Sequence, residues 1–171
     1  MTTSVDVINW SASDDYRRSF GCFPSGVTVV TTVTTDGKPV GLTINSFTSV
    51  SLSPPMILWC LKENSKLRDV FRHCSHFAVH VLGHDQQEIS RRFCAPVEDR
   101  FAGLTWHRGT GDVPLLDGCS AVIECRRGEV VTWGDHDVIN GVVERHGYCD
   151  KEPLAFLAGS YGAFRRFPEV A

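Results

Sequence analysis

The chain has 171 residues, a hydrophobic fraction of 42% and a charged fraction of 22%, which suit one globular domain with a single core. Its formal net charge of -3 and its dispersed arginine doublets argue against nucleic acid as a partner. Apolar runs are too short for a membrane span, and the first residues lack the features of a signal peptide, so we expect a cytoplasmic protein that does not enter a membrane.

The cysteines stand at irregular spacings and include no C-x-x-C pair. In a reducing compartment we expect them to be small buried hydrophobic residues, not a disulfide framework or a zinc ribbon.

The first half of the chain predicts a flexible segment, a helix and a hairpin. We expect residues 1–12 to form a flexible N-terminal segment and residues 13–167 to form one domain. Ser13-Asp14-Asp15 predicts the start of a short helix that ends near Phe20. The β-branched run at 27–34 predicts a strand, and the turn at Asp36-Gly37 predicts that residues 38–47 return beside it.

Further strands and two short helices follow. Residues 56–61 read as a buried strand, and Asn64-Ser65 predicts a helix over 66–73. Alternation of Phe77, Val79 and Val81 with polar residues predicts a half-buried strand. Asp85 with Glu88 resembles a capping box for a helix over 86–93. Strand-like stretches at 121–131, 137–145 and 155–164 complete the chain, which predicts one β-barrel with a few helices packed outside it.

The common nucleotide-binding and hydrolase motifs are absent. Gly109-Thr110-Gly111 leads into Asp-Val-Pro and not into a helix, and Gly21-x4-Gly26 is followed by Val-Thr in place of the Walker lysine. There is also no G-x-S-x-G elbow. A nucleotide would therefore be held by another scheme.

Short hydroxyl and amide side chains crowd residues 41–55, at the end of the predicted hairpin. Many neutral donors on a rigid backbone suit a phosphate and a ribityl chain. The alternative is a Thr/Ser-rich edge strand whose hydroxyls bond locally. Composition alone leaves both interpretations open.

A second candidate lies at the predicted strand-to-helix junction at 60–67. It combines Lys62, Lys66 and the capping Ser65 with the free N–H groups of a helix start, which is an anion-binding arrangement. An ordinary helix cap is the alternative interpretation.

Motifs in order along nearly the whole chain carry a family resemblance. They are Y-R-R-S-F-G at 16–21, F-P-S-G-V-T-V-V-T-T at 23–32, residues 41–55, S-R-R-F at 90–93, D-R-F-A-G-L at 99–104, G-D-H at 134–136 and residues 153–161. With them the chain resembles the short-chain NAD(P)H:flavin reductases, the small components of two-component flavin-dependent monooxygenases. The resemblance implies an FMN-binding split barrel, that is, an antiparallel split β-barrel with a few short peripheral helices. It also implies a homodimer with flavin near the interface.

The resemblance also implies the flavin site. Asn45 and its neighbours would face the isoalloxazine edge, Ser46 would help hold the ribityl-phosphate, and residues 62–67 would approach the phosphates. Asp99 and Arg100 would lie near the rest of an FAD. The flavin residues implied in this way are Asn45, Ser46, Phe47, Thr48, Ser49, Ser51, Leu52, Lys62, Ser65, Lys66, Leu67, Asp99 and Arg100.

The nicotinamide nucleotide would enter against His136, Phe156, Leu157, Ala158 and Gly159. His136 would orient the nicotinamide or make a structural hydrogen bond. Many relatives carry an aromatic residue or histidine followed by Arg-Gly where this chain reads Phe156-Leu157-Ala158-Gly159. The lost arginine removes one contact to the pyridine nucleotide, which leaves NADH and NADPH both open.

The histidines at 76, 80 and 84 suggest a metal site at first sight. On a strand, His76 and His80 would stand about 13 Å apart, which is too far for one zinc ion. We therefore expect no metal.

These observations predict an oxidoreductase that reduces FAD or FMN with NAD(P)H and supplies diffusible reduced flavin to a partner monooxygenase. Hydride transfer is the cofactor's own chemistry, so no catalytic residue is required of the protein. The alternatives are an oxidase or reductase with permanently bound flavin, and a non-catalytic flavin-binding module.

Overall fold

The computed structural model of the chain describes residues 8, 16–165 and 167. The helices are α1 Tyr16–Gly21, α2 Arg68–His73, α3 Gln87–Cys94 and the 3-10 helix η1 Thr110–Asp112. The strands are β1 Ser25–Gly26, β2 Thr28–Val33, β3 Pro39–Ile44, β4 Thr48–Leu52, β5 Pro55–Lys62, β6 His76–Val81, β7 Trp106–Arg108, β8 Pro114–Leu116, β9 Ala121–Trp133, β10 His136–Tyr148, β11 Leu154–Leu157 and β12 Ser160–Ala163.

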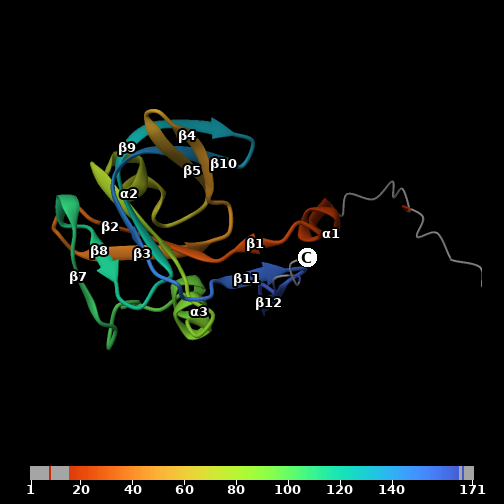
Figure 1. Cartoon of the computed structure of the whole chain (residues 1–171). Helices are drawn as coiled ribbons and strands as arrows, with labels where there is room; N and C mark the ends of the chain where they lie inside the picture. Colours follow the sequence, from red (N-terminus) through yellow and green to blue (C-terminus); the bar gives the residue numbers. More distant parts are fainter. Residues whose placement is uncertain (1–7, 9–15, 166, 168–171) are drawn as a thin grey trace, which may run out of the picture.

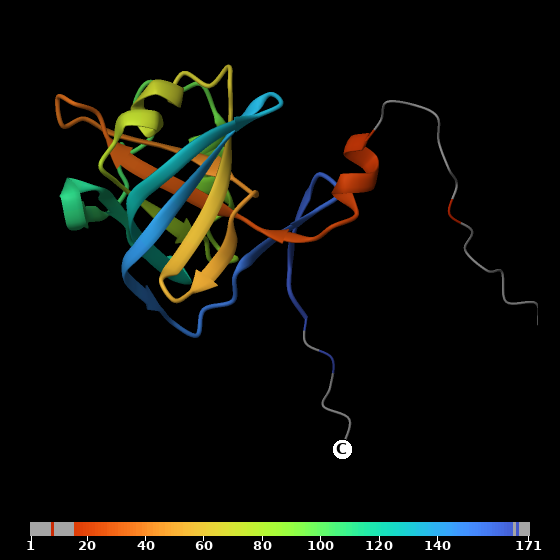
Figure 2. The ribbon, with the colours of Figure 1, turned by 90° about the horizontal axis from the view of Figure 1, so that it is seen from above.

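Within the described residues, seven antiparallel strands form one sheet in the order β3-β2-β6-β9-β10-β5-β4, which curls into a barrel (Figure 1). A smaller sheet, β1-β11-β12, projects from the barrel together with α1, and we call these four elements the arm (Figure 2). This mainly β architecture with short peripheral helices confirms the predicted split barrel.

The predicted hairpin forms as β2 and β3, with Thr28 opposite Ile44. Gly37 takes a φ of +77° in the turn, a conformation that glycine adopts without steric cost. β3 and β4 are the two edges of the large sheet. The link from Ile44 to Thr48 spans at most about 14 Å, so the two edges lie close together at this end of the barrel.

The barrel interior is filled by aromatic and aliphatic side chains. Trp59 and Phe77 are fully buried, and Trp59 meets Phe71 of α2 edge to face with ring centroids 5.0 Å apart. Because Phe71 enters this cluster, α2 closes one end of the barrel.

Strand β6 corrects one prediction. Its residues Phe77, Ala78, Val79 and His80 are all buried, not alternately exposed. The reason is tertiary: Val113 and Leu115, around β8, pack over Ala78 on the outer face.

Helix starts also differ from the predictions. The expected caps Ser13–Asp15 of α1, like residues 1–12 apart from Ile8, lie outside the described residues. The Asp85 side chain does not cap α3 but forms an ion pair with Lys151 at 2.8 Å. Gln86, the residue before α3, instead accepts a hydrogen bond at its Oε1 from Gly83 N at 2.9 Å. Helix α2 begins at Arg68, later than predicted.

The seven cysteines are all free, as expected. Cys125 is buried and Cys60, Cys74 and Cys119 are half-buried, but Cys22, Cys94 and Cys149 are exposed, so the expectation of burial was wrong for these three. Across the described residues, no helix is both long and apolar enough to cross a membrane.

Candidate functional site

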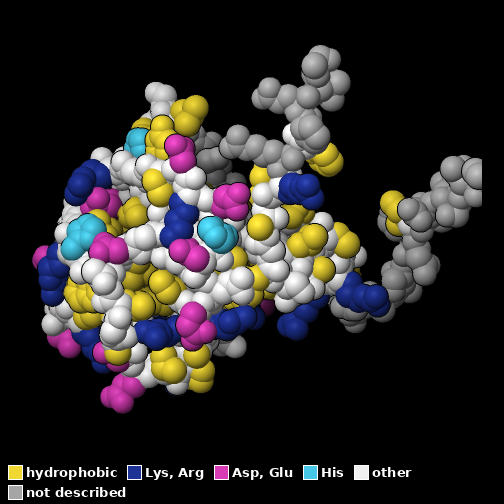
Figure 3. All heavy atoms as spheres, turned by 60° about the horizontal axis from the view of Figure 1, so that its bottom comes forward, with side chains coloured by type: hydrophobic (Ala, Val, Ile, Leu, Met, Phe, Trp, Pro, Cys, Tyr) yellow, Lys and Arg dark blue, Asp and Glu magenta, His cyan; other side chains and the backbone are white. Residues whose placement is uncertain are grey.

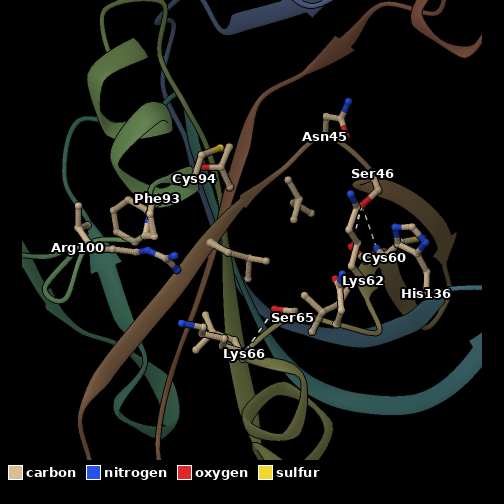
Figure 4. A pocket seen from close by; sticks show the side chains of 18 of the residues that line it. Asn45, Ser46, Cys60, Lys62, Ser65, Lys66, Phe93, Cys94, Arg100 and His136 are labelled. Atoms are coloured by element: carbon tan, nitrogen blue, oxygen red, sulfur yellow. Dashed lines mark hydrogen bonds between the residues drawn. The ribbon is translucent and has the colours of Figure 1, made fainter. Parts of the chain in front are cut away.

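A cavity of about 770 Å³ lies between the link after β3, the end of β5, the turn before α2 and the end of α3 (Figure 4). Its lining residues are Leu42, Thr43, Ile44, Asn45, Ser46, Cys60, Leu61, Lys62, Asn64, Ser65, Lys66, Leu67, Phe93, Cys94, Pro96, Val97, Glu98, Arg100 and His136. The volume is that of a typical small-molecule site.

The first wall is the outer face of β5 and β10. His136 pairs with Lys62, and residues paired across antiparallel strands project to the same face. Ser46 secures the link to this wall, since its hydroxyl accepts a hydrogen bond from Cys60 N at 2.9 Å and donates to Cys60 O at 3.3 Å. Burial raises the pKa of the Cys60 thiol, which therefore stays neutral at pH 7.

The turn before α2 forms the floor of the cavity. Ser65 N donates to Lys62 O at 3.0 Å, and the Ser65 hydroxyl accepts a hydrogen bond from Leu67 N at 3.2 Å. Ser65 therefore stabilises the turn and does not cap α2 itself, which has no side-chain cap. The predicted helix-terminus anion site is corrected to a turn that presents Lys62 and Lys66 to the cavity.

The opposite wall is built by α3 and the loop after it (Figure 4). The Arg100 guanidinium donates to Gly41 O at 2.6 Å and, through Nη2, to Ala95 O at 2.9 Å, which ties this loop to β3. Phe93 is buried behind it, and a Cβ on Gly41 would come within 2.9 Å of the Phe93 ring. Glycine at position 41 thus permits the close approach of α3 to β3.

Positive charge predominates around the cavity. Among the described residues that line it, Lys62, Lys66 and Arg100 stand against the one carboxylate of Glu98. His136 Nδ1 lies 2.7 Å from Asp135 Oδ1, a hydrogen bond that lowers the pKa of Asp135. Cations, neutral hydroxyl and amide groups and the apolar surface of Leu42, Ile44 and Val97 suit an anionic ligand with a flat apolar part.

The structure brings together eight of the residues implied by the resemblance: Asn45, Ser46, Lys62, Ser65, Lys66, Leu67, Arg100 and His136.

The other predicted flavin residues do not line this cavity in the single chain. Phe47 packs against the barrel core, and the Asp99 carboxylate accepts a hydrogen bond from Phe101 N at 2.9 Å. Strand β4, with Thr48, Ser49, Ser51 and Leu52, is an edge strand, and Leu52 is 92% exposed. In the single chain β4 is thus a Thr/Ser-rich edge strand, whereas Asn45 and Ser46 of the same segment line the cavity.

The predicted nicotinamide residues 156–159 also lie outside the cavity, on the arm. Phe156 packs against Tyr161 with centroids 5.6 Å apart. Ala158 and Gly159 form the turn between β11 and β12, both with positive φ.

Sequence reasoning missed the wall formed by Phe93, Cys94, Pro96 and Val97. The available signal was the proline two residues after the end of the α3 pattern, which marks a chain reversal. Nothing local indicated that this reversal faces β3.

Comparison with known proteins gives consistent matches. The family model described as "Flavin reductase like domain" matches residues 20–165. The chain is 42% identical over 154 residues to the FMN reductase (NADH) SmoA of Agrobacterium fabrum, covering 90% of this chain and 87% of that protein. It is 41% identical to the reductase component of the flavin-dependent trigonelline monooxygenase of Acinetobacter baylyi, covering 86% of this chain but only 47% of the relative.

Among solved structures, the NADH:FAD oxidoreductase SgcE6 of Streptomyces globisporus, in complex with NAD and FAD fragments, superposes with a TM-score of 0.81. The two share 37% sequence identity, and the match covers 91% of this chain and 92% of that one.

Proposed function

Because this chain belongs to the flavin reductase like domain family, we propose that it catalyses NAD(P)H-dependent reduction of FAD or FMN. The observation that carries the proposal is the cavity that Lys62, Ser65 and Lys66 line together with Asn45 and Ser46. We assign the activity to one domain over residues 13–167, within which the family match falls.

The residues present fit a flavin. Lys62 and Lys66 would bind its phosphate, Asn45 would hydrogen-bond to the polar ring edge, and Leu42 and Ile44 would pack on apolar ring surface. Bound flavin supplies the hydride acceptor, so the protein's task is to hold the two nucleotides face to face and exclude water. The neutral Cys60 thiol and the backbone-bound Ser46 hydroxyl do not form an activated nucleophile.

We propose FAD as the preferred flavin. Lys62 and Lys66 would already bind the phosphate of an FMN, but the cavity continues past Lys66 to the wall of Phe93 and Val97. This additional, apolar end of the cavity suits the adenine of an FAD. SgcE6 is named an NADH:FAD oxidoreductase, and SmoA is named an FMN reductase (NADH). Both names support NADH as the donor here.

A homodimer would cover the arm. Tyr16, Phe20 and Leu157 are exposed large hydrophobic residues of the arm, as is Phe23 in the link between α1 and β1, and Figure 3 shows hydrophobic side chains gathered on this projection. A patch of this kind marks an interaction surface. A second copy would also bring further groups to each cavity, and in this way residues 156–159 would reach a nicotinamide.

The product is reduced flavin for a separate monooxygenase, as the names of relatives such as the trigonelline monooxygenase component support. The cytoplasm, where NAD(P)H is available, is the proposed location.

Steady-state kinetics test this function. NADH or NADPH oxidation should saturate with added free flavin, and reduced flavin should cross a dialysis membrane under anaerobic conditions to a monooxygenase. Flavin that survives extensive dialysis, with no dependence on added flavin, would favour a permanently bound cofactor. Flavin binding without NAD(P)H oxidation would leave only the non-catalytic module.

A further inference from the structure

One carboxylate outside the cavity is completely buried and fully engaged. The Asp137 side chain is 0% exposed and faces two arginines of α2. Arg68 donates from Nε to Oδ2 at 2.7 Å and from Nη2 to Oδ1 at 3.0 Å, and Arg72 donates to Oδ1 at 2.8 Å. Thr132 of β9 donates to the same oxygen at 2.7 Å. We call these four residues the Asp137 cluster.

The position of Asp137 follows from the alternation of β10. His136 pairs with Lys62 and both line the cavity, whereas Asp137 pairs with the buried Leu61 and faces the closed end of the barrel. The side chain that holds α2 thus follows directly after the residue that forms a wall of the cavity. Movement of Asp137 would move His136.

The other partner, Arg68, follows directly after the turn at 62–67. Arg68 N donates to Ser65 O at 3.1 Å, and its guanidinium also pairs with Glu63 at 3.2 Å. Glu63 N in turn donates to Asp135 O at 2.9 Å. The turn that carries the lysines is therefore joined to the β9–β10 hairpin at its start through Glu63 and at its end through Arg68.

Closing a barrel end does not by itself require charge. Apolar side chains fill such a space without the desolvation that a buried ion pair suffers, and the aromatic Phe71 already does so here. The bidentate Arg68–Asp137 geometry adds a fixed direction and distance. Its hydrogen bonds hold the pKa of Asp137 well below the usual range, so the carboxylate stays charged throughout the assay range.

We propose that Asp137 is a positioning residue that, through Arg68, sets the distance between the end of the lysine-bearing turn, at Lys66, and His136, and through it the affinity for flavin. The inference rests on the proposed flavin site. It assigns to Asp137 no contact with flavin or nicotinamide.

The test is Asp137→Asn, which keeps the shape and removes the charge, with Thr132→Val as a milder variant that removes a single hydrogen bond. Glu124→Gln is the matched control, because Glu124 is another buried carboxylate, held by Arg145 at 3.2 Å and by Thr110 N, and it does not line the cavity. Flavin dissociation constants from fluorescence titration, flavin KM, kcat and thermal unfolding are measured for all four proteins.

We expect Asp137→Asn to raise the flavin dissociation constant and KM by about fivefold or more while kcat stays within about twofold of wild type. Thr132→Val should shift both constants the same way by less. Glu124→Gln should lower the unfolding temperature without raising either constant. If Asp137→Asn does not fold, the test is the comparison of the flavin dissociation constants and KM of Thr132→Val with those of Glu124→Gln.

Unchanged flavin affinity in a folded Asp137→Asn overturns the inference; if that variant does not fold, unchanged affinity in Thr132→Val does so. An equal rise of the flavin dissociation constant in Glu124→Gln also overturns it. Failure of the proposed function looks different, because the wild-type protein itself would then bind no flavin in the titration.

Discussion

The Ser46 hydroxyl makes both a donated and an accepted hydrogen bond with the backbone of Cys60, at 3.3 Å and 2.9 Å. The link after β3 is not paired with β5 as a strand, and the Ser46 side chain supplies hydrogen bonds to the β5 backbone in place of such pairing. It ties the link to β5 where the cavity opens, and it fixes Asn45 beside it.

Ser46→Ala should therefore affect stability and binding together. The half-buried Cys60 N–H and carbonyl lose their partner, which should lower the free energy of unfolding by about 1–3 kcal/mol. The flavin dissociation constant should rise as the link loosens. Urea unfolding and flavin titration measure the two effects.

Ser120→Ala is the control for this substitution, since the buried Ser120 hydroxyl also donates to a backbone carbonyl but does not line the cavity. It should cost stability and leave flavin affinity unchanged. A Ser46→Ala protein that binds flavin as tightly as wild type would mean that the link does not form part of the site.

The lysine pair provides a second prediction. The double variant Lys62→Gln, Lys66→Gln should weaken binding of FAD and FMN by about 1.4- to fivefold per lysine, because exposed charges contribute about 0.2–1 kcal/mol each. The loss should shrink at high salt, and riboflavin, which has no phosphate, should bind the variant and wild type equally. Lys38→Gln, in the β2–β3 turn, is the control; an equal loss for riboflavin would argue against a phosphate at the lysines.

Ala158 tests the nicotinamide segment. Ala158→Arg should lower the KM for NAD(P)H with little change in kcat, because it restores a uniform contact to the nucleotide. The backbone there has a φ of +49°, which arginine tolerates no worse than alanine. Ala158→Asn serves as the control: it suits this turn, should raise stability by about 0.5–1 kcal/mol and should leave KM unchanged. A KM unmoved by arginine would remove residues 156–159 from the nucleotide site.

His80 predicts how stability depends on pH. Its ring is fully buried and Nδ1 donates to Val29 O at 3.0 Å, and burial lowers the pKa of His80 from 6.5 to about 4. Between these values the unfolded chain binds a proton that the folded chain does not. Stability from this group is thus complete above about pH 6.5 and falls by about 3 kcal/mol as the pH drops to about 4.

Urea unfolding at pH 7.5 and pH 5 measures this loss. His80→Asn retains a donor toward Val29 but cannot titrate, so the difference between the two pH values should shrink in the variant. The Asp137 carboxylate titrates only below this window and does not contribute to the difference. An unchanged pH dependence in His80→Asn would assign the effect to other groups.

The arm predicts the oligomeric state. Light scattering should give twice the chain mass of 18.9 kDa, and Phe20→Asp should reduce it to the single chain. Phe20 is 73% exposed, and Leu52→Asp is the control, because it places the same charge on a residue of β4 that is 92% exposed. Dissociation by Leu52→Asp, with Phe20→Asp still dimeric, would place the interface on the barrel edge.

Local sequence determined the strands and the hairpins well. The β-branched run at 28–33 predicts a strand and Asp36-Gly37 predicts a turn, and both signals lie within a few neighbouring residues. The structure confirms the predicted hairpin as β2 and β3. Propensity, alternation and turn geometry act over such distances, which is why a barrel was predictable. The order of motifs along the chain further identified the family.

Only the tertiary structure decided which residues meet around the cavity. Phe93 faces β3 because Arg100 bonds to Gly41, far earlier in the chain, and His80 is buried because a distant hairpin covers its strand. The Asp137–Arg68 pair likewise joins positions 69 residues apart. Sequence periodicity gives the face on which a side chain lies, but the partner covering that face is chosen by packing of the whole chain.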